Sequence, residues 1–375
     1  MSSDLKFDFF GDTSYLTHGL HIYPAKFPPQ LPRNILKEFA KPGDIVLDPF
    51  VGSGTTLVEA VLVNVNSIGV DTNPLACLIS KVKTTPIDPK QLYLVDDLCG
   101  RVSASFFELQ MGEKREDVIP NIPNIIHWFQ KNVVQELSLI NKSILSVQKK
   151  DIIDLALVAL SSIIVRVSNQ ESDTRFAAIN KNIKDGDTIR FFLEKLSEYK
   201  KIMKIFWEKL PEKKVKAKIL NIDVRNLSRY LKHPVDIVIT SPPYANTYDY
   251  YLYHKFRMYW LNMDVASAQQ TEIGSRREYS SLKKGKGKWK QDLTESFQEI
   301  LNVLKSEKLA FVVIGDSVIQ KELVKADIII TEIATSLNCK VIDIISSDLS
   351  NHSKVFNPAF TQKGKKEHLI MLRKQ

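Results

Sequence analysis

Cysteine is scarce in this sequence, and the three cysteines lie far apart. Cys77, Cys99 and Cys339 form no CxxC pair, and none has cysteine or histidine partners at metal-ligand spacing. A disulfide framework and a structural zinc site are therefore excluded. We expect a protein of the reducing cytoplasm.

Long uninterrupted apolar runs are also missing. The N-terminal segment carries Asp4 and Asp8 and has no apolar core, so it lacks the pattern of a secretory signal. The most apolar stretch, residues 152–167, is interrupted by Asp154 and is shorter than the ~20 residues that a membrane span needs. The sequence predicts no membrane anchor.

The composition of the 375-residue chain is otherwise that of a folded, soluble protein. Hydrophobic residues make up 44% and charged residues 25%, which excludes collagen-like, coiled-coil and wholly disordered chains. The length predicts two units, or one unit enlarged by an insertion. Lys and Arg total 52 against 43 Asp and Glu, a net charge of +9 that favours a polyanionic partner.

Short apolar segments alternate with helical patterns over much of the chain. Seven segments have strand texture, at residues 44–48, 67–71, 216–222, 235–240, 309–314, 340–345 and 367–372. Helices between such strands predict an α/β fold with a mostly parallel, doubly wound sheet.

The region between the second and third of these strands has a different texture. Residues 133–144, 152–167 and 189–207 show helical periodicity, with almost no strand signal around them. We therefore predict a large, mostly helical insertion at residues 85–211. The catalytic domain would then consist of residues 1–84 and 212–375.

Two glycines mark a ligand site after the first strand. Gly52 and Gly54 lie between a strand and a helix, where bare backbone lets a nucleotide-like ligand approach the helix N-terminus. The third glycine of the dinucleotide fingerprint and the Lys-Ser/Thr of a phosphate loop are absent, which weakens NAD and ATP as ligands. Asp71, at the end of the second strand, suits ribose hydroxyls or caps the helix that begins near Pro74, a role that Asn73 or Thr72 could also take. A tight turn without any ligand is the alternative for the glycines.

The segment Thr240-Ser241-Pro242-Pro243-Tyr244 follows an apolar strand and lies at the carboxyl edge of the sheet. Two consecutive prolines cannot extend a strand ladder, so the backbone there must be rigid and irregular. Carbonyls and a hydroxyl beside an aromatic ring provide acceptors for an amino group and a stacking surface for a planar base. An ordinary proline turn is the alternative.

In these segments the sequence resembles the S-adenosylmethionine-dependent DNA amino-methyltransferases, and among them the N4-cytosine group. The resemblance rests on residues 23–28, 48–56, 69–74 and 240–244, with weaker similarity at 221–223, 314–317 and 366–372.

The resemblance implies a Rossmann-like methyltransferase fold that binds S-adenosylmethionine and double-stranded DNA. Its motifs assign the cofactor contacts to Tyr23, Ala25, Lys26, Phe27, Asp48, Pro49, Phe50, Gly52, Ser53, Gly54, Thr55, Asp71, Thr72, Asn73 and Asp223. Within this set the loop 48–55 would hold the methionine moiety, Asp71 the ribose and Asp223 the adenine. Ser241, Pro242, Pro243 and Tyr244 are the implied catalytic residues, acting on a base flipped out of the duplex. The resemblance also implies a restriction–modification system with a separate restriction endonuclease.

The residue before the two prolines bears on the choice of base. Family members that methylate adenine N6 usually have Asp or Asn there, so Ser241 favours cytosine N4. Cytosine C5 methylation needs a thiolate, usually in a Pro-Cys pair, but Ala76, Leu98 and Asn338 precede the three cysteines. Adenine N6 methylation, tRNA guanine N2 methylation and a non-catalytic DNA-binding protein on the same scaffold remain as alternatives.

No motif identifies the residues that contact DNA. The candidate regions for target recognition are the insertion and residues 248–290. Residues 276–290 are rich in Gly, Ser and Lys and predict a mobile loop. Its lysines surround a tryptophan, a composition suited to phosphate contacts or to a solvated loop. The candidate DNA contacts are Arg166, Arg175, Lys283, Lys284, Lys286, Lys288, Trp289 and Lys290. A cluster of Tyr248, Tyr250, Tyr251, Tyr253 and Trp260 suits a base pocket or a helix core.

Overall fold

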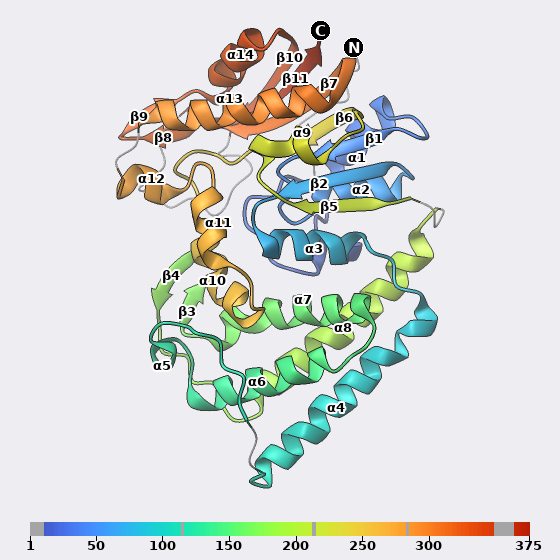
Figure 1. Ribbon diagram of the computed structural model, residues 1–375, viewed down its shortest axis with the longest axis vertical. Coiled ribbons are helices and arrows are strands. Elements are labelled where there is room, and N and C mark those ends of the chain that lie inside the picture. Colours follow the sequence, from blue (N-terminus) through green and yellow to red (C-terminus); the bar gives the residue numbers. More distant parts are fainter. Residues whose placement is uncertain (1–10, 114–115, 212–214, 283–284, 349–363) are drawn as a thin grey trace.

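The computed structural model describes residues 11–113, 116–211, 215–282, 285–348 and 364–375 (Figure 1). Its centre is a seven-stranded sheet made of β1 (Ile45–Asp48), β2 (Asn66–Asp71), β5 (Ala217–Asn221), β6 (Val235–Thr240), β7 (Leu304–Gly315), β10 (Cys339–Asp348) and β11 (Lys366–Lys374). The spatial order is β10-β11-β7-β6-β1-β2-β5. In this sheet β11 runs antiparallel to the other six strands. The predicted mostly parallel sheet is confirmed, and each of the seven strand segments contributes one strand.

Helices cover both faces of this sheet, as a doubly wound fold requires. The helix α1 (Gln30–Phe39) packs on one face, and α13 (Lys286–Val303) and α14 (Ala326–Ser336) pack on the other. Along β6, Ile237 and Ile239 point toward α1, while Val238 between them points toward α13. This alternation follows from the two-residue period of a strand and explains why the central strands are apolar throughout.

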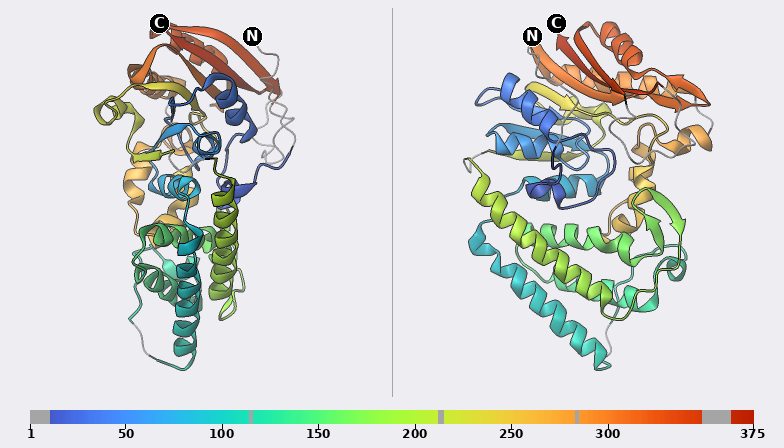
Figure 2. Two further views of the ribbon diagram at one scale, coloured as in Figure 1. Left: turned by 90° about the vertical axis from the view of Figure 1, so that its right-hand side faces the viewer. Right: turned by 180° about the vertical axis from the view of Figure 1, so that it is seen from behind.

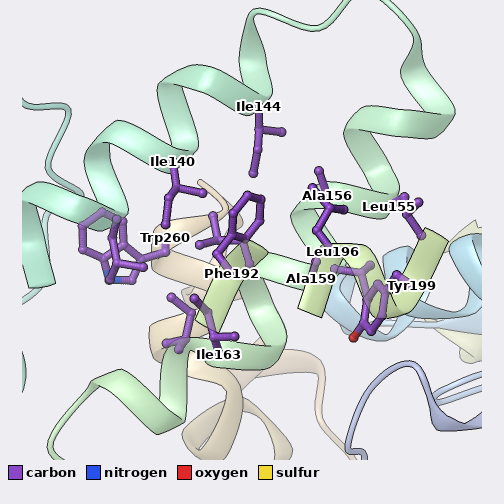
Figure 3. Close-up of a cluster of buried hydrophobic side chains, with 14 of the residues drawn as sticks. Ile140, Ile144, Leu155, Ala156, Ala159, Ile163, Phe192, Leu196, Tyr199 and Trp260 are labelled. Carbon is purple, nitrogen blue, oxygen red and sulfur yellow. The ribbon is translucent and has the colours of Figure 1, made fainter. Parts of the chain in front are cut away.

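Residues 85–211 form a helical layer beside the sheet. They contain α4 (Tyr93–Gln110), α5 (Ile125–Trp128), α6 (Lys131–Leu145), α7 (Lys150–Val167) and α8 (Asp187–Lys209), which include the three predicted helices. Figure 3 shows the shared core, in which Ile140, Ile163 and Phe192 lie beside Trp260. Trp260 comes from α10 (Tyr250–Trp260), so a helix that follows β6 in the chain is built into this layer.

A two-stranded hairpin interrupts the helical layer, and the sequence did not predict it. It consists of β3 (Gln170–Ser172) and β4 (Arg175–Ala178), paired antiparallel. Strands of three and four residues are too short to show a periodic pattern. In Figures 1 and 2 the hairpin lies beside α5 and α10, at one end of the layer.

The prediction of a mobile loop at residues 276–290 is wrong for much of its length. The structure has α12 (Arg276–Ser280) there, and α13 already begins at Lys286. Tyr279 and Trp289 are buried and supply the apolar anchors that the polar composition hides. Lys283 and Lys284 lie outside the described residues.

The remaining elements connect these layers. They are α2 (Thr55–Leu62), α3 (Pro74–Thr84), α9 (Leu227–Tyr230), α11 (Val265–Thr271), β8 (Ser317–Ile319), β9 (Glu322–Val324) and the 3₁₀ turns η1 (Leu16–Gly19), η2 (Pro89–Gln91) and η3 (Val224–Asn226). Among the helices that the structure describes, none combines the length and the apolar character needed to cross a membrane.

Candidate active site

The candidate site lies where the strand order of the sheet reverses. From the central pair β1 and β6, the chain continues to β2 on one side and to β7 on the other. Ligands of open α/β sheets bind at the carboxyl ends of the strands at such a switch point. Here Thr240 Oγ1 donates a 2.7 Å hydrogen bond to Asp48 Oδ1, which ties these two strand ends together. Asp48 is only 2% exposed, and burial raises its pKa to about 6.

The turn after β1 requires both of its glycines. Gly52 has φ of 47° and Gly54 has φ of 85°, in the left-handed region that residues with a side chain rarely adopt. A Cβ on Gly54 would also lie 3.0 to 3.1 Å from atoms of Ser80. The turn is therefore held tightly between β1 and α3.

Asp71 fastens this turn to the end of β2. One of its carboxylate oxygens accepts a 2.9 Å hydrogen bond from the Gly52 amide, and the other accepts a 2.8 Å hydrogen bond from the Asn73 amide. Asn73 is the residue that caps α3, through a 2.9 Å hydrogen bond from the Leu75 amide. Asp71 is thus not the helix cap, and burial raises its pKa to about 6.

A cavity of about 920 Å³ opens beside this turn. All but two of the predicted cofactor residues line it, together with Ser241 and Pro243. Those predicted residues are Tyr23, Ala25, Lys26, Phe27, Asp48, Pro49, Phe50, Gly52, Ser53, Thr55, Asp71, Thr72 and Asn73. Segments that lie far apart in the chain therefore meet at one site.

Gly54 and Asp223 are the two predicted cofactor residues that do not line the cavity. The Asp223 carboxylate caps η3 and forms a 2.6 Å ion pair with Arg225. Its neighbours Ile222 and Val224 line the cavity instead. The segment that follows β5 therefore reaches the site, but it presents apolar side chains there.

The N-terminal segment closes one side of the cavity. The ring of Tyr23 is buried and stacks on Tyr250 and His254, with centroid distances of 5.5 and 5.0 Å. Ala25 adopts a left-handed conformation with φ of 56°, and Lys26 Nζ donates to the His18 carbonyl at 3.2 Å. This segment is held against α10 by aromatic stacking.

Sequence reasoning missed the far wall of the cavity, which comes from α10, α11 and the residues after α11. Its most polar member is Glu272, which accepts a 2.6 Å hydrogen bond from the Tyr250 amide at the start of α10. Burial raises the pKa of Glu272 well above its usual range. No local motif surrounds Glu272, so only the folded chain shows that a third acid faces this cavity.

A smaller cavity of about 350 Å³ adjoins the first one. Its wall contains the whole segment Ser241 to Tyr244, together with Tyr248 and Tyr250, and Ser241 and Tyr250 line both cavities. Of the predicted aromatic cluster, Tyr248 and Tyr250 are thus at this site, whereas Trp260 belongs to the core of the helical layer.

The hydroxyl groups of this segment form a short chain. Ser241 Oγ donates to the Tyr244 hydroxyl at 3.5 Å, and the Tyr244 hydroxyl donates to Glu367 on β11 at 2.8 Å. The Ser241 oxygen lines both cavities, and its lone pairs can accept hydrogen bonds from a ligand. Glu367 is 123 residues from Tyr244, and its place in this chain was not foreseen.

Trp289 is not a DNA-inserting residue, which corrects its prediction. Its side chain is 0% exposed, and its Nε1 donates a 3.0 Å hydrogen bond to the Pro243 carbonyl. A buried indole must place its N–H on an acceptor, and the carbonyl of a proline turn offers one. Trp289 therefore positions the Ser241 to Tyr244 segment through its hydrogen bond to the Pro243 carbonyl.

The other predicted DNA contacts are spread over the surface. Lys288 pairs with Asp292, Lys290 with Glu332 at 2.6 Å, and Lys286 with Glu322 at 3.9 Å. Arg166 lies over the ring of Phe191 at 3.3 Å from its centroid. Of the predicted contacts that the structure describes, only Arg175 lines a cavity near the site. The structure does not bring these residues together.

We expect Trp289→Phe to lower the turnover number of the protein about 2- to 10-fold, because it removes one hydrogen bond worth roughly 0.5–1.5 kcal/mol from the Pro243 carbonyl. The dissociation constant of the ligand in the larger cavity should not change. Steady-state kinetics and equilibrium titration would measure the two quantities.

The matched control is Trp260→Phe. Trp260 is equally buried, and its Nε1 has no hydrogen-bond partner among the described residues. This change should affect only the free energy of unfolding. Equal losses of turnover in both variants would show that Trp289 acts through general packing.

The chain is similar in sequence to known DNA methylases. Residues 6–82 match the model of the N6/N4 DNA methylase family. The type II methyltransferase M.MvaI of Kocuria varians is 27% identical, over 87% of this chain and 83% of its own length. The type II methyltransferase M.MjaII of Methanocaldococcus jannaschii is 24% identical, over 84% of this chain and 75% of its own length.

Over residues 6–82 the chain is similar to the N6/N4 DNA methylases. The segment that matches the methylase model contains three of the motifs that surround the larger cavity, at residues 23–28, 48–56 and 69–74. Among solved structures, TrmN from Thermus thermophilus is 11% identical with a TM-score of 0.33, over 94% of this chain and 50% of TrmN.

Proposed function

We propose that this protein is an S-adenosylmethionine-dependent DNA methyltransferase that methylates the exocyclic N4 amine of a cytosine. The observation that carries the proposal is the position of Ser241 on the shared wall of two adjoining cavities. One cavity has the size and lining for the cofactor, and the other has the aromatic walls and acceptors for a base. A group at their junction can contact the atoms between which a methyl group moves.

The residues of the larger cavity fit S-adenosylmethionine. Asp48 and Asp71 face it, and Lys26 is the one cation among the described residues of its lining, so this excess of acids suits a ligand with a net positive charge. The Ser53 hydroxyl is buried in its wall and has no hydrogen-bond partner within the described residues, so it is available to a polar ligand. Asp71 would accept from the ribose hydroxyls, and the glycine turn would hold the methionine moiety. The bound cofactor would supply an electrophilic methyl group.

The residues of the smaller cavity would orient the amine. Ser241 Oγ and the Pro242 carbonyl would accept its two hydrogens, because the Pro243 carbonyl is already bonded to Trp289. Holding both hydrogens favours a pyramidal nitrogen and directs its lone pair toward the cofactor cavity. Tyr244 would stack on the base, which has to leave the duplex to enter the cavity, at a cost of a few kcal/mol. Serine before the two prolines supports cytosine over adenine.

The relatives support a place in a restriction–modification system. M.MvaI and M.MjaII are both named type II methyltransferases, and each aligns over most of its own length. We therefore propose that the protein protects one DNA sequence from a separate restriction endonuclease.

The test is incubation of the protein with S-adenosylmethionine and separate pools of duplex DNA and tRNA, followed by nucleoside mass spectrometry. N4-methylcytosine from DNA is the expected product. N6-methyladenine would overturn the choice of base, and methylated guanosine from tRNA would overturn DNA as the substrate. Binding of DNA without any methylated product would indicate a non-catalytic scaffold.

The raised pKa values of Asp48 and Asp71, both about 6, predict opposite pH dependences for binding and folding. Cofactor affinity should rise with pH through this range and level off near pH 7, because a cationic ligand favours the ionised carboxylates. In the unfolded chain their pKa values return to about 3.8, so the folded protein holds these protons more tightly. The contribution of both carboxyls to the free energy of unfolding should therefore fall as pH rises from about 4 to 6.

Titrations with S-adenosylmethionine and chemical denaturation between pH 4.5 and about 7.5 would measure the two trends. The control is Asp71→Asn, which removes one of the titrating groups. The difference between wild type and this variant isolates Asp71 from all other acids. A difference independent of pH would show that Asp71 is ionised throughout the range.

A further inference from the structure

A third cavity adjoins the base-sized one and opens as a groove of about 1530 Å³. Tyr248 lines both cavities, so the groove begins where the base pocket ends. Arg175, Arg276 and Lys365 lie along it, opposite one acid, Asp249. The Asp249 carboxylate accepts a 3.2 Å hydrogen bond from the Arg277 amide, and three cationic side chains against this one acid give the groove a positive character.

One wall of this groove is the β3–β4 hairpin. Its residues Thr174 and Arg175 are exposed and line the groove at the turn of the hairpin. Within the described parts of the chain, the one ion pair of Arg175 is an exposed pair with Glu171, at 2.9 Å. Exposed pairs of this kind contribute about 0–1 kcal/mol, so Arg175 can exchange this partner for another one at little cost.

The hairpin is held in place by buried contacts although its outer side is exposed. Asp173, in its turn, pairs with Arg257 of α10, whose side chain is only 1% exposed. Gln170 Nε2 donates to the Tyr253 carbonyl of the same helix at 3.2 Å. The ring of Phe176 packs on Phe256, also in α10, at a centroid distance of 5.3 Å.

These anchors connect the hairpin to the candidate active site. The helix α10 that holds it also carries Tyr250, which lines both the cofactor-sized and the base-sized cavity. Moving the hairpin away from α10 would leave the buried Arg257 without its partner Asp173, which is strongly destabilising. The hairpin therefore stays fixed against α10. Because the hairpin and the base pocket are both attached to α10, DNA bound at the hairpin lies at a fixed distance from the base pocket.

We propose that the β3–β4 hairpin is the element that reads the target sequence, a proposal that rests on the function proposed above. A two-stranded ribbon fits the major groove of B-DNA, where arginine donates to guanine O6 and N7, and threonine bonds either base edge or packs on a thymine methyl group. The turn of the hairpin enters the major groove beside the flipped base. Thr174 and Arg175 contact base edges there, and Arg276 and Lys365 contact the phosphates of the strand that carries the target.

The test uses the double variant Thr174→Ala/Arg175→Ala and a library of duplexes with randomised sequence, with methylated sites read by sequencing. The expected result is a loss of preference at one or two positions next to the methylated base. The rate on the wild-type site should fall about 10- to 100-fold, with unchanged cofactor affinity and melting temperature. The matched control is Arg190→Ala, an exposed arginine of the same helical layer paired with Asp187 and Glu194. It should keep the wild-type preference.

Two results would overturn the reading role while the proposed function stands. One is a double variant that methylates the same sequence with the same preference as wild type. The other is a rate that falls by one factor on every sequence, with a salt dependence smaller by about one ion, because that pattern indicates a phosphate contact. A wild-type protein that methylates no DNA would instead refute the proposed function itself, and this proposal with it.

Discussion

Replacing Ser241 with alanine should lower the methylation rate about 100- to 1,000-fold, the usual effect of removing one preorganised polar contact to the reacting group. The hydroxyl lies on the wall between the two cavities, where the lone pairs of its oxygen can accept a hydrogen bond from an amine. The dissociation constant of S-adenosylmethionine should change by less than about 3-fold, because the larger cavity has many other contacts. Single-turnover rates on duplex DNA and equilibrium titration of the cofactor measure these two quantities.

Tyr244 provides the matched comparison for this prediction. Tyr244→Phe keeps the ring and loses only the hydroxyl that bonds Glu367, so it should cost about 10-fold or less. Tyr244→Ala also loses the stacking surface, and its rate should fall much further. Wild-type rates in Ser241→Ala, or a loss confined to cofactor affinity, would contradict the proposed mechanism.

The second large effect is expected for Asp71→Ala, which should weaken S-adenosylmethionine binding about 100-fold or more. Its carboxylate holds the Gly52 and Asn73 amides, and it would also accept from the ribose. Hydrogen bonds to a charged group contribute about 1.5–3 kcal/mol each, and the variant loses them at the turn as well as at the ligand. Isothermal titration with S-adenosylmethionine would measure the loss.

Asp44→Ala is the control for this variant. Asp44 is half-buried, precedes β1 and accepts a 2.8 Å hydrogen bond from the Lys41 amide, at the opposite end of the strand from the site. It should bind the cofactor like wild type. Equal affinity in wild type and Asp71→Ala would refute the assigned cofactor site, and a wild type without any affinity would favour the non-catalytic scaffold.

Much of the fold was predictable because its signals are local. The strands of the sheet are short apolar runs bounded by turn residues, and α6, α7 and α8 follow helical periodicity. Gly52 and Gly54 are required by their own backbone angles, and Asn73 caps the helix that follows it directly. Features that depend on neighbours in the chain can be recognised without knowledge of the folded structure.

The less accurate predictions concern residues whose partners lie far away in the sequence. Trp289 was placed among surface lysines by composition, yet it is buried against Pro243, 46 residues earlier. Residues 276–290 have a loop-like composition, yet burial of two aromatic side chains makes part of them helical. The composition of a segment describes its average polarity and does not show which of its individual side chains are buried.

The sequence by itself determined the order of the strands along the chain, the glycine turn and the rigid segment after β6, because backbone angles and side-chain periodicity specify these directly. Only the tertiary structure brought Glu272, Glu367 and Trp289 to the site and fastened a hairpin of the helical layer to α10. These contacts join distant segments, and they form only when the sheet and the helical layer are packed against each other. For that reason the cofactor-binding half of the proposed site is readable from local motifs, while the half that would meet DNA depends on the fold.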